Sequence, residues 1–358
     1  MYISNLTIDH LRNISHADIV LSPTLNFVHG DNGAGKSSIL EGIYLLARAR
    51  SFRNTHNRSL VQQGSKQVIL FSEVVQSDGK INKIGIRKQG TRTDIKINGR
   101  QIDRLSDLVT TLTISLVTPQ THRIVEEGPE YRRRMLNWGV FHVEHNFRQL
   151  VSNYNRVLAQ RNAALKAKQS KVEIWDEQLS QHAVEIVNHQ LAYMDSWNNL
   201  IKSLGSGIPY LDKLSLNYQP GWESKFTLID QLRRKLDLDK SRGFTSVGPH
   251  RSEVQIKIDS RPAKEVLSRG QQKMLMIILM LAQSKLMTQS VGEKAIFLID
   301  DFHSELDRSA QTQVIDKLVE EQCQAIITTI DRSNVSVSER ELAAKMFHVE
   351  QGTVQEID

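Results

Sequence analysis

The sequence predicts an α/β fold with a parallel sheet, interrupted by an inserted helical lobe. Three observations support this prediction. A glycine-rich loop stands between a short apolar strand and a helix near the N-terminus, and the C-terminal third again alternates strands with helices. Between them, apolar residues recur at helical spacing. At 358 residues the chain exceeds one typical domain, so we expect two lobes.

The glycine-rich loop begins at Gly30 and fits the pattern G-x-x-x-x-G-K-[ST]. Its glycines allow backbone N–H groups to point at phosphate oxygens, and the following helix adds its dipole. Lys36 is predicted to reach the β- and γ-phosphates of ATP, and Ser37 to hold Mg²⁺. The alternative, a glycine-rich turn with a stray lysine, does not explain the complete pattern. The residues expected to bind ATP are Gly30, Asp31, Asn32, Gly33, Ala34, Gly35, Lys36, Ser37 and Ser38.

Strand patterns dominate the first part of the chain. Residues 2–8, 17–21 and 25–28 alternate or run apolar, and residues 67–98 contain further strands with a hairpin turn at Asn98-Gly99. From about residue 129 to 204, leucine, alanine and long polar residues replace these patterns, which predicts two or three long helices. We therefore expect an N-terminal part of the first lobe over 1–125, a mainly helical second lobe over 126–242, and the rest of the first lobe over 243–358.

The C-terminal part carries a pair of carboxylates at the end of an apolar strand. Residues 295–299 read as a buried parallel strand, and Asp300 and Asp301 follow it directly. Ligands of α/β sheets bind at the carboxyl ends of the strands. We expect Asp300 to orient Mg²⁺ and Asp301 to polarise the attacking water as a catalytic group. The alternative is that the acids only cap the next helix.

A second motif, Leu-Ser-Arg-Gly-Gln from Leu267, opens a long helix predicted over 268–287. Ser268 and Gln271 form a capping box that any helix can use. Ser268 followed by Gly270 also leaves free N–H groups that can bind an anion.

The motifs and their order resemble the ABC-type ATPases, in the branch that contains the SMC proteins, and within it the RecF family of recombination mediators. The resemblance spans nearly the whole chain. It rests on residues 30–38, 48–53, 130–134, 246–251, 267–273 and 297–307.

The resemblance implies further roles. Arg12 and Asn13 match a nucleotide-contacting segment, and Gln120 matches the loop glutamine that senses Mg²⁺. Ser268, Gly270 and Gln271 match the motif that binds the γ-phosphate of a second subunit, which implies an ATP-dependent homodimer. Residues 304–307 match the loop that crosses the dimer interface. The family also implies partners: DNA that is single-stranded, gapped or at a junction, with RecO and RecR.

Three departures from the wider pattern favour slow, timed hydrolysis. Asp301 stands where many relatives have glutamate, Arg269 replaces a glycine, and Thr328 and Thr329 occupy the region of a switch histidine.

Basic residues suggest contacts with the DNA backbone, which need no sequence readout. Arg50, Arg53, Arg132 and Arg133 are the candidates, although a solvated helix face would explain each of them singly. Further basic residues follow in the helical lobe, at Arg156, Arg161, Lys166, Lys168, Lys171 and 233–235.

Composition and charge bound the remaining alternatives. The net charge of +6 permits a polyanionic partner, and a lone cysteine, Cys323, allows no intramolecular disulfide. No secretory signal or membrane span is visible, so we expect a cytoplasmic protein without membrane contact. The ATPase subunit of a membrane transporter, a chromosome-structural protein and a metabolite kinase are alternatives. The inserted lobe is basic and larger than transporter subunits usually carry, which disfavours a transporter subunit. It is too short for a long coiled-coil arm, which disfavours a chromosome-structural protein. A metabolite kinase would not explain the motif at Leu267.

Overall fold

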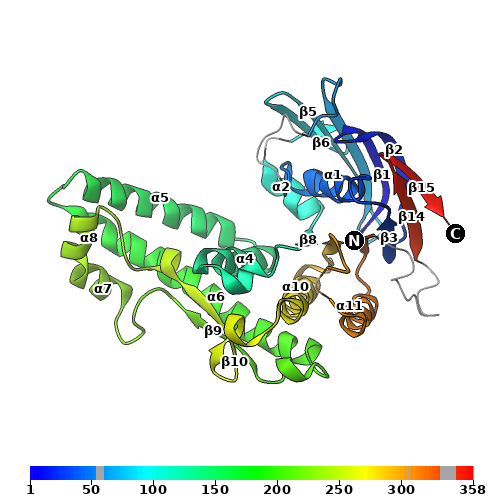
Figure 1. Cartoon of the computed structure of the whole chain (residues 1–358). Helices are drawn as coiled ribbons and strands as arrows, with labels where there is room; N and C mark the ends of the chain where they lie inside the picture. The colour runs from blue at the N-terminus through cyan, green and yellow to red at the C-terminus, as the bar shows by residue number, and fades with distance from the viewer. Residues whose placement is uncertain (54–59, 103, 305, 331–343, 358) are drawn as a thin grey trace. The chain divides into compact units, whose positions relative to one another are not determined.

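The computed structural model describes residues 1–53, 60–102, 104–304, 306–330 and 344–357. The chain forms two compact units (Figure 1). Unit 1 combines Met1–Thr121 with Arg269–Asp358, and unit 2 is His122–Ser268. Unit 2 thus extends beyond the end at residue 242 that the sequence suggested. The reason is a strand pair, because β9 (Leu214–Gln219) pairs antiparallel with β10 (Glu253–Ile258) and retains the later segment in unit 2.

One sheet of unit 1 is antiparallel, with the order β2-β1-β4-β5-β6-β7. Period-two alternation contributes to it, since Leu6 and Ile8 of β1 are buried while Thr7 and Asp9 are partly exposed. Its strands are β1 (Tyr2–Leu11), β2 (Ile14–Val20), β4 (Val68–Val75), β5 (Ile81–Gln89), β6 (Arg92–Ile97) and β7 (Arg100–Gln101).

The other sheet of unit 1 has the order β15-β14-β3-β13-β12-β8 and is parallel from β14 to β8. The central strands β12 and β13 are buried along their whole length, as strands covered on both faces are, and β13 carries two threonines at its end. Its strands are β3 (Leu25–His29), β8 (Ile114–Val117), β12 (Ile296–Ile299), β13 (Ala325–Thr329), β14 (Lys345–Glu350) and β15 (Thr353–Ile357).

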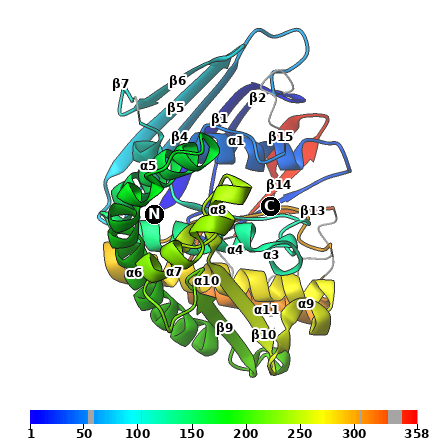
Figure 2. The same cartoon turned by 90° about the vertical axis from the view of Figure 1, so that its left-hand side faces the viewer.

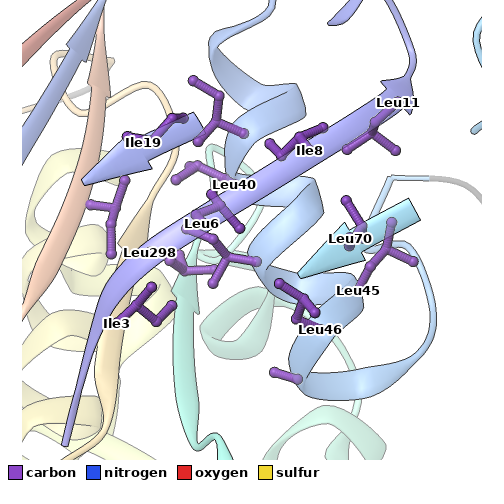
Figure 3. Packing of buried hydrophobic residues seen from close by; sticks show 14 of the residues in the cluster. Ile3, Leu6, Ile8, Leu11, Ile19, Leu40, Leu45, Leu46, Leu70 and Leu298 are labelled. Carbon is purple, nitrogen blue, oxygen red and sulfur yellow. The ribbon is translucent and has the colours of Figure 1, made fainter. Parts of the chain in front are cut away.

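Helix α1 (Lys36–Arg48) packs its apolar face between elements of the two sheets. Figure 3 shows Leu40, Leu45 and Leu46 of α1 beside Leu6 and Ile8 of β1. All five side chains are fully buried, and burying each such side chain contributes about 1.5–3 kcal/mol. The core of unit 1 therefore fixes the start of α1, which directly follows the glycine-rich loop.

The remaining helices of unit 1 are α2 (Leu105–Thr111), α10 (Arg269–Val291) and α11 (Arg308–Glu320). Among the described residues, α10 is the one helix whose length and composition would allow it to cross a membrane. However, 67% of its apolar window is buried inside the protein, which is typical of a core helix.

Unit 2 is built from long helices and a small antiparallel sheet of order β11-β10-β9. Helices α5 and α6 pack side by side (Figure 2). The sequence pattern indicated helices over 129–204, and β9 lies beyond that segment. The elements are α3 (Arg123–Glu126), α4 (Pro129–Val143), α5 (Phe147–Lys166), α6 (Asp176–Leu204), α7 (Leu228–Arg234), α8 (Leu236–Arg242), α9 (Ala263–Val266) and β11 (Arg261–Pro262).

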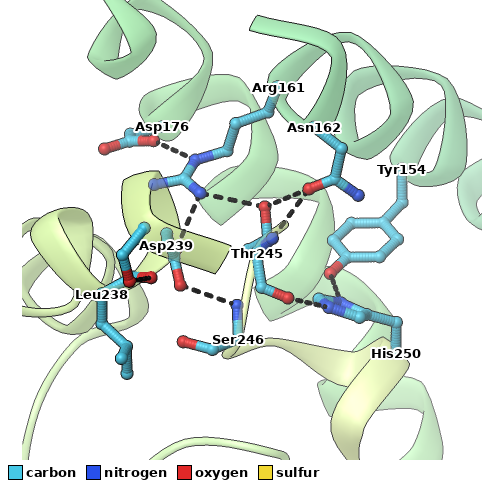
Figure 4. A network of polar contacts seen from close by, with 10 residues as sticks. Tyr154, Arg161, Asn162, Asp176, Leu238, Asp239, Thr245, Ser246 and His250 are labelled. Carbon is cyan, nitrogen blue, oxygen red and sulfur yellow. Dashed lines mark hydrogen bonds and ion pairs between the residues drawn. The ribbon is translucent and has the colours of Figure 1, made fainter. Parts of the chain in front are cut away.

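Arg161 of α5 lies in the core of unit 2 and is not a surface cation. Its guanidinium donates to Asp176 at 2.7 Å and to Asp239 and Thr245 at 2.9 Å each (Figure 4). A buried charge is tolerated only when it is paired and hydrogen-bonded in this way. The prediction that Arg161 is one of the basic residues facing DNA is therefore wrong.

His250 is held in the same network. One ring nitrogen lies 2.7 Å from the Tyr154 hydroxyl and the other 3.0 Å from the carbonyl oxygen of Thr245 (Figure 4). Burial lowers the pKa of His250 to about 4, so the imidazole is neutral at pH 7. A Cβ atom on Gly248 would lie 2.6 Å from the Tyr154 hydroxyl oxygen, so the chain at Gly248 packs tightly against α5.

Candidate nucleotide-binding site

The glycine-rich loop adopts the conformation that its sequence predicts. Gly30, Gly33 and Gly35 have φ angles of 150°, 84° and 124°, which other residues rarely adopt. A Cβ atom on Gly30 would lie 2.2 Å from the carbonyl oxygen of Val349. The N-cap residue Gly35 makes no side-chain cap, and the start of α1 faces the loop, where its N–H groups and dipole favour an anion.

Lys36, the first residue of α1, is largely buried and folds back onto the loop. Its Nζ donates to the carbonyl oxygens of Gly30 at 2.5 Å and Asp31 at 2.9 Å. Burial lowers the pKa of Lys36, and the charges of Asp301, Asp300 and Asp31 oppose that shift. A cation held beside a loop of N–H groups is the arrangement that phosphate binding requires.

The order of the parallel strands brings the two acids to the loop. Strands β3 and β12 both neighbour β13, so their carboxyl ends meet at one edge of the sheet. There the Ser37 hydroxyl donates to Asp300 Oδ1 at 2.8 Å, although the two residues are 263 positions apart. The two residues that the sequence predicted as Mg²⁺ ligands thus lie next to each other, and the ligation itself stays a prediction.

Thr328, at the end of the intervening strand β13, holds both acids. Its hydroxyl donates to Asp300 Oδ1 at 2.9 Å and accepts the N–H of Asp301 at 2.8 Å. Asp301 has a φ of 52°, a left-handed conformation that is costly for a residue with a side chain. The sequence interpretation noted Thr328 only as a departure from a family pattern and missed this contact.

These residues line one cavity of about 690 Å³ within unit 1. The lining joins the glycine-rich loop, the turn between β1 and β2, and the ends of β12 and β13. It comprises Arg12, Asn13, Asn32, Gly33, Gly35, Lys36, Ser37, Ser38, Arg53, Pro119, Asp300, Asp301, Thr328 and Ile330.

Asn13 and Arg12 brace the loop from the turn between β1 and β2. Asn13 Nδ2 donates to the carbonyl oxygens of Gly33 at 3.2 Å and Ala34 at 2.7 Å. Arg12 directs Nε and Nη2 to the fully buried Glu41 carboxylate at 2.9 and 2.8 Å. Both residues line the cavity as the resemblance implied, and the Arg12 guanidinium is engaged with Glu41.

The C-terminal hairpin of β14 and β15 closes on the same loop, which the sequence did not indicate. The N–H of Gly352 donates to the carbonyl oxygen of Ala34 at 2.8 Å. A Cβ atom on Gly352 would lie 2.1 Å from the carbonyl oxygen of Asn13. The local signal was Gly352, which suits a two-residue turn, and both Gln351 and Gly352 have positive φ angles there.

Four further residues that the family resemblance implied, Gln120, Ser268, Gly270 and Gln271, do not line this cavity. Gln120 is exposed and does not line the cavity, whereas its neighbour Pro119 does. Gly270 and Gln271 occupy the first turn of α10 in unit 1 and are absent from the described lining of this cavity. Ser268 is the last residue of unit 2. Glu305 of the predicted interface loop lies outside the described residues.

Arg53 lies in the nucleotide cavity, where the sequence predicted a DNA contact. The backbone N–H of Arg53 donates to the Ser51 hydroxyl at 2.9 Å, and the Ser51 hydroxyl donates to the Glu41 carboxylate. This places an exposed guanidinium at the phosphate-binding cavity. Arg50, two residues after the end of α1, is exposed, and its contact with DNA stays a prediction.

Arg132 and Arg133 are engaged inside unit 2. Arg132 makes paired 2.9 Å bonds to the Glu253 carboxylate and donates to two carbonyl oxygens of the chain before α4. Arg133 donates to the carbonyl oxygen of Ser252 at 2.7 Å, and burial lowers its pKa. Both side chains tie α4 to β10, so the prediction of free DNA-binding cations at these positions needs correction.

The donor set fits a magnesium ion. The Ser37 hydroxyl and the Asp300 carboxylate are hard oxygen ligands within hydrogen-bond distance of each other. Mg²⁺ binds through few protein oxygens and retains waters and substrate phosphates, so this small set is sufficient.

Comparison with known proteins identifies the family. The family model described as RecF/RecN/SMC N terminal domain matches residues 2–355. The DNA replication and repair protein RecF of Shewanella baltica (strain OS223) is 34% identical over 362 residues, covering all of both chains. That of Hahella chejuensis (strain KCTC 2396) is 37% identical over 373 residues, with equal coverage.

Solved structures agree. A recombination mediator protein RecF bound to ATP, in the RecFOR pathway, superposes with a TM-score of 0.82 at 26% identity, covering 100% of this chain and 98% of that one. An SMC head bound to the C-winged helix domain of ScpA, with a TM-score of 0.61 at 16% identity, covering 100% of this chain and 97% of that one, shares the fold. The chain therefore belongs to the RecF/RecN/SMC family and, within it, to the RecF group, with an ABC-type ATPase fold.

Proposed function

We propose that this chain is an ATP-dependent DNA-binding protein of recombinational repair and replication that dimerises around ATP on DNA. The observation that carries the proposal is the convergence of Lys36, Ser37, Asp300 and Asp301 at the edge of one parallel sheet. Binding of ATP at this edge needs Lys36 to exchange the carbonyl oxygens of its own loop for phosphate oxygens.

Hydrolysis follows from the roles of the two carboxylates. Ser37 and Asp300 would hold Mg²⁺, which would supply positive charge next to the phosphates. Asp301 orients the attacking water and accepts its proton. Thr328 holds the Asp301 backbone at the cavity, which positions the carboxylate for this role. Its side chain is one methylene shorter than glutamate, which supports slow hydrolysis that acts as a timer. Arg53 adds a positive charge near the phosphates.

Dimerisation completes the site in our proposal. Ser268 directly precedes α10, Gly270 and Gln271 lie in its first turn, and all three would meet the ATP of a second copy. Gln120 would sense Mg²⁺ from the loop after β8. ATP then acts as a ligand of the interface, and its hydrolysis releases the dimer from DNA.

The DNA substrates we propose are gaps and junctions between single and double strands. The solved relative is described as a mediator of the RecFOR pathway, which supports RecO and RecR as partners. With them, the dimer would help a recombinase replace single-strand-binding protein in the cytoplasm. Backbone contacts from exposed basic residues such as Arg50 would supply the affinity.

Sedimentation tests this proposal. The protein is compared with ATP, with ADP and without nucleotide, each with and without gapped DNA. We expect a dimer with ATP alone among the nucleotides, and joint sedimentation with gapped DNA in that state. A protein that stays monomeric with ATP and DNA would contradict the clamp function.

A further inference from the structure

The turn that follows Asp301 has no regular secondary structure to hold it. Asp301 adopts a left-handed backbone with a φ of 52°, which is unfavourable for a residue with a side chain. Within the turn, the N–H of Ser304 donates to the carbonyl oxygen of Asp301 at 3.1 Å. A conformation of this kind persists only where the surrounding structure imposes it.

Lys273 of α10 supplies a contact to both ends of this turn. Its Nζ donates to the carbonyl oxygen of Ser304 at 2.8 Å and to that of Asp301 at 3.1 Å. The side chain is 1% exposed. Burying an ammonium group costs free energy that a methionine of similar length would not cost, so a purely packing role does not explain a lysine here.

The position of Lys273 on its helix links two parts of the proposed site. Gly270 and Gln271 lie in the first turn of α10, less than one turn before Lys273. The other end of the contact is the backbone of the group that orients the attacking water. A shift of the first turn of α10 is therefore transmitted to Asp301 through one side chain.

We propose that Lys273 is a positioning residue for ATP hydrolysis, which fixes the Asp301 turn to the start of α10. The inference rests on the proposed ATPase function and deepens it. Lys273 itself touches neither nucleotide nor water in this account. It acts through Asp301, so its loss should affect the chemical step and leave phosphate binding by Lys36 intact.

The test replaces Lys273 with methionine and measures ATP binding, steady-state hydrolysis and thermal unfolding. We expect kcat to fall about 10²-fold, as a small misplacement of a reacting group causes, with ATP affinity unchanged. Lys285→Met is the matched control, because Lys285 lies on the same helix and pairs with Glu321 at 2.6 Å. Lys273→Arg keeps two donors and should restore most of kcat.

A double substitution separates positioning from general destabilisation. In the Asp301→Asn background, Lys273→Met should cause little further loss of kcat, because its route of action is already removed. If Lys273→Met does not fold, Lys273→Gln replaces it in the same comparison, since its shorter amide cannot span both carbonyl oxygens.

The outcomes are distinguishable. A wild-type kcat in Lys273→Met, or a full additional loss in the Asp301→Asn background, would overturn the positioning role. Loss of ATP binding together with a lower unfolding temperature would assign Lys273 a structural role only. Absence of ATP binding and hydrolysis in the unsubstituted protein would instead overturn the proposed function itself.

Discussion

Replacing Thr328 with valine tests the two hydrogen bonds that hold the Asp300 carboxylate and the Asp301 backbone. The substitution preserves the shape of a side chain that is 1% exposed and removes only its hydroxyl. Asp300 Oδ1 then retains the Ser37 hydroxyl as its donor, and the N–H of Asp301 loses its acceptor. The perturbation is therefore confined to two hydrogen bonds at the end of β13.

The magnitude follows from those two bonds. A hydrogen bond to a charged group contributes about 1.5–3 kcal/mol to stability, and a neutral one about 0.5–1.5 kcal/mol. We expect Thr328→Val to lower the free energy of unfolding of unit 1 by about 2–4 kcal/mol in total. For a unit of this size that corresponds to a fall in Tm of roughly 5–15 °C.

Calorimetry and an ATPase assay measure the two consequences. Hydrolysis should fall together with Tm, because Asp301 loses the bond that fixes its backbone. Thr312→Val is the control, since Thr312 is exposed on α11 and bonds only within its own helix. If Thr328→Val melts and hydrolyses ATP as the control does, the bridging role of Thr328 is refuted.

The other predictions concern the phosphate loop, the carboxylates, the second motif and unit 2. Lys36→Met should abolish tight ATP binding and ATP-dependent dimerisation, and a variant that sediments as an ATP-bound dimer would refute the assignment. Asp301→Asn should keep ATP binding, slow hydrolysis by roughly 10²–10⁴-fold and prolong residence on DNA. Asp300→Asn should instead weaken Mg²⁺-dependent ATP binding. Nucleotide-binding, ATPase and DNA-dissociation assays on the two variants distinguish these outcomes. Ser268→Arg should leave ATP binding to the monomer nearly intact but block dimerisation and hydrolysis, and wild-type ATPase activity would reduce Ser268 to a helix cap. Burial lowers the pKa of His250 from 6.5 to about 4, so the unfolded chain binds its proton first as the pH falls. The free energy of unfolding should therefore decrease between pH 6.5 and about 4, and urea titrations should find this dependence reduced in His250→Gln.

Local sequence was sufficient to predict those parts of the site that are built from consecutive residues. The glycine-rich loop requires positive φ angles at fixed spacing, and Gly30, Gly33 and Gly35 adopt them. Likewise, an apolar strand that ends in two acids is written in residues 295–301, and β12 ends directly before Asp300. The fold class and the principal residues of the cavity were predictable for this reason.

Tertiary structure decided what depends on residues far apart in the chain. The insertion of β13 between β3 and β12 puts Thr328 against the Asp300 carboxylate and the Asp301 backbone, and strand order leaves no mark in local periodicity. Basic side chains look alike in sequence, yet burial and partners make Arg132 a structural tie and bring Arg53 to the nucleotide cavity. The sequence by itself thus determined which chemical groups the site contains, while long-range packing decided which of them meet, because contacts between distant segments are selected by the whole core and not by their neighbours in the chain.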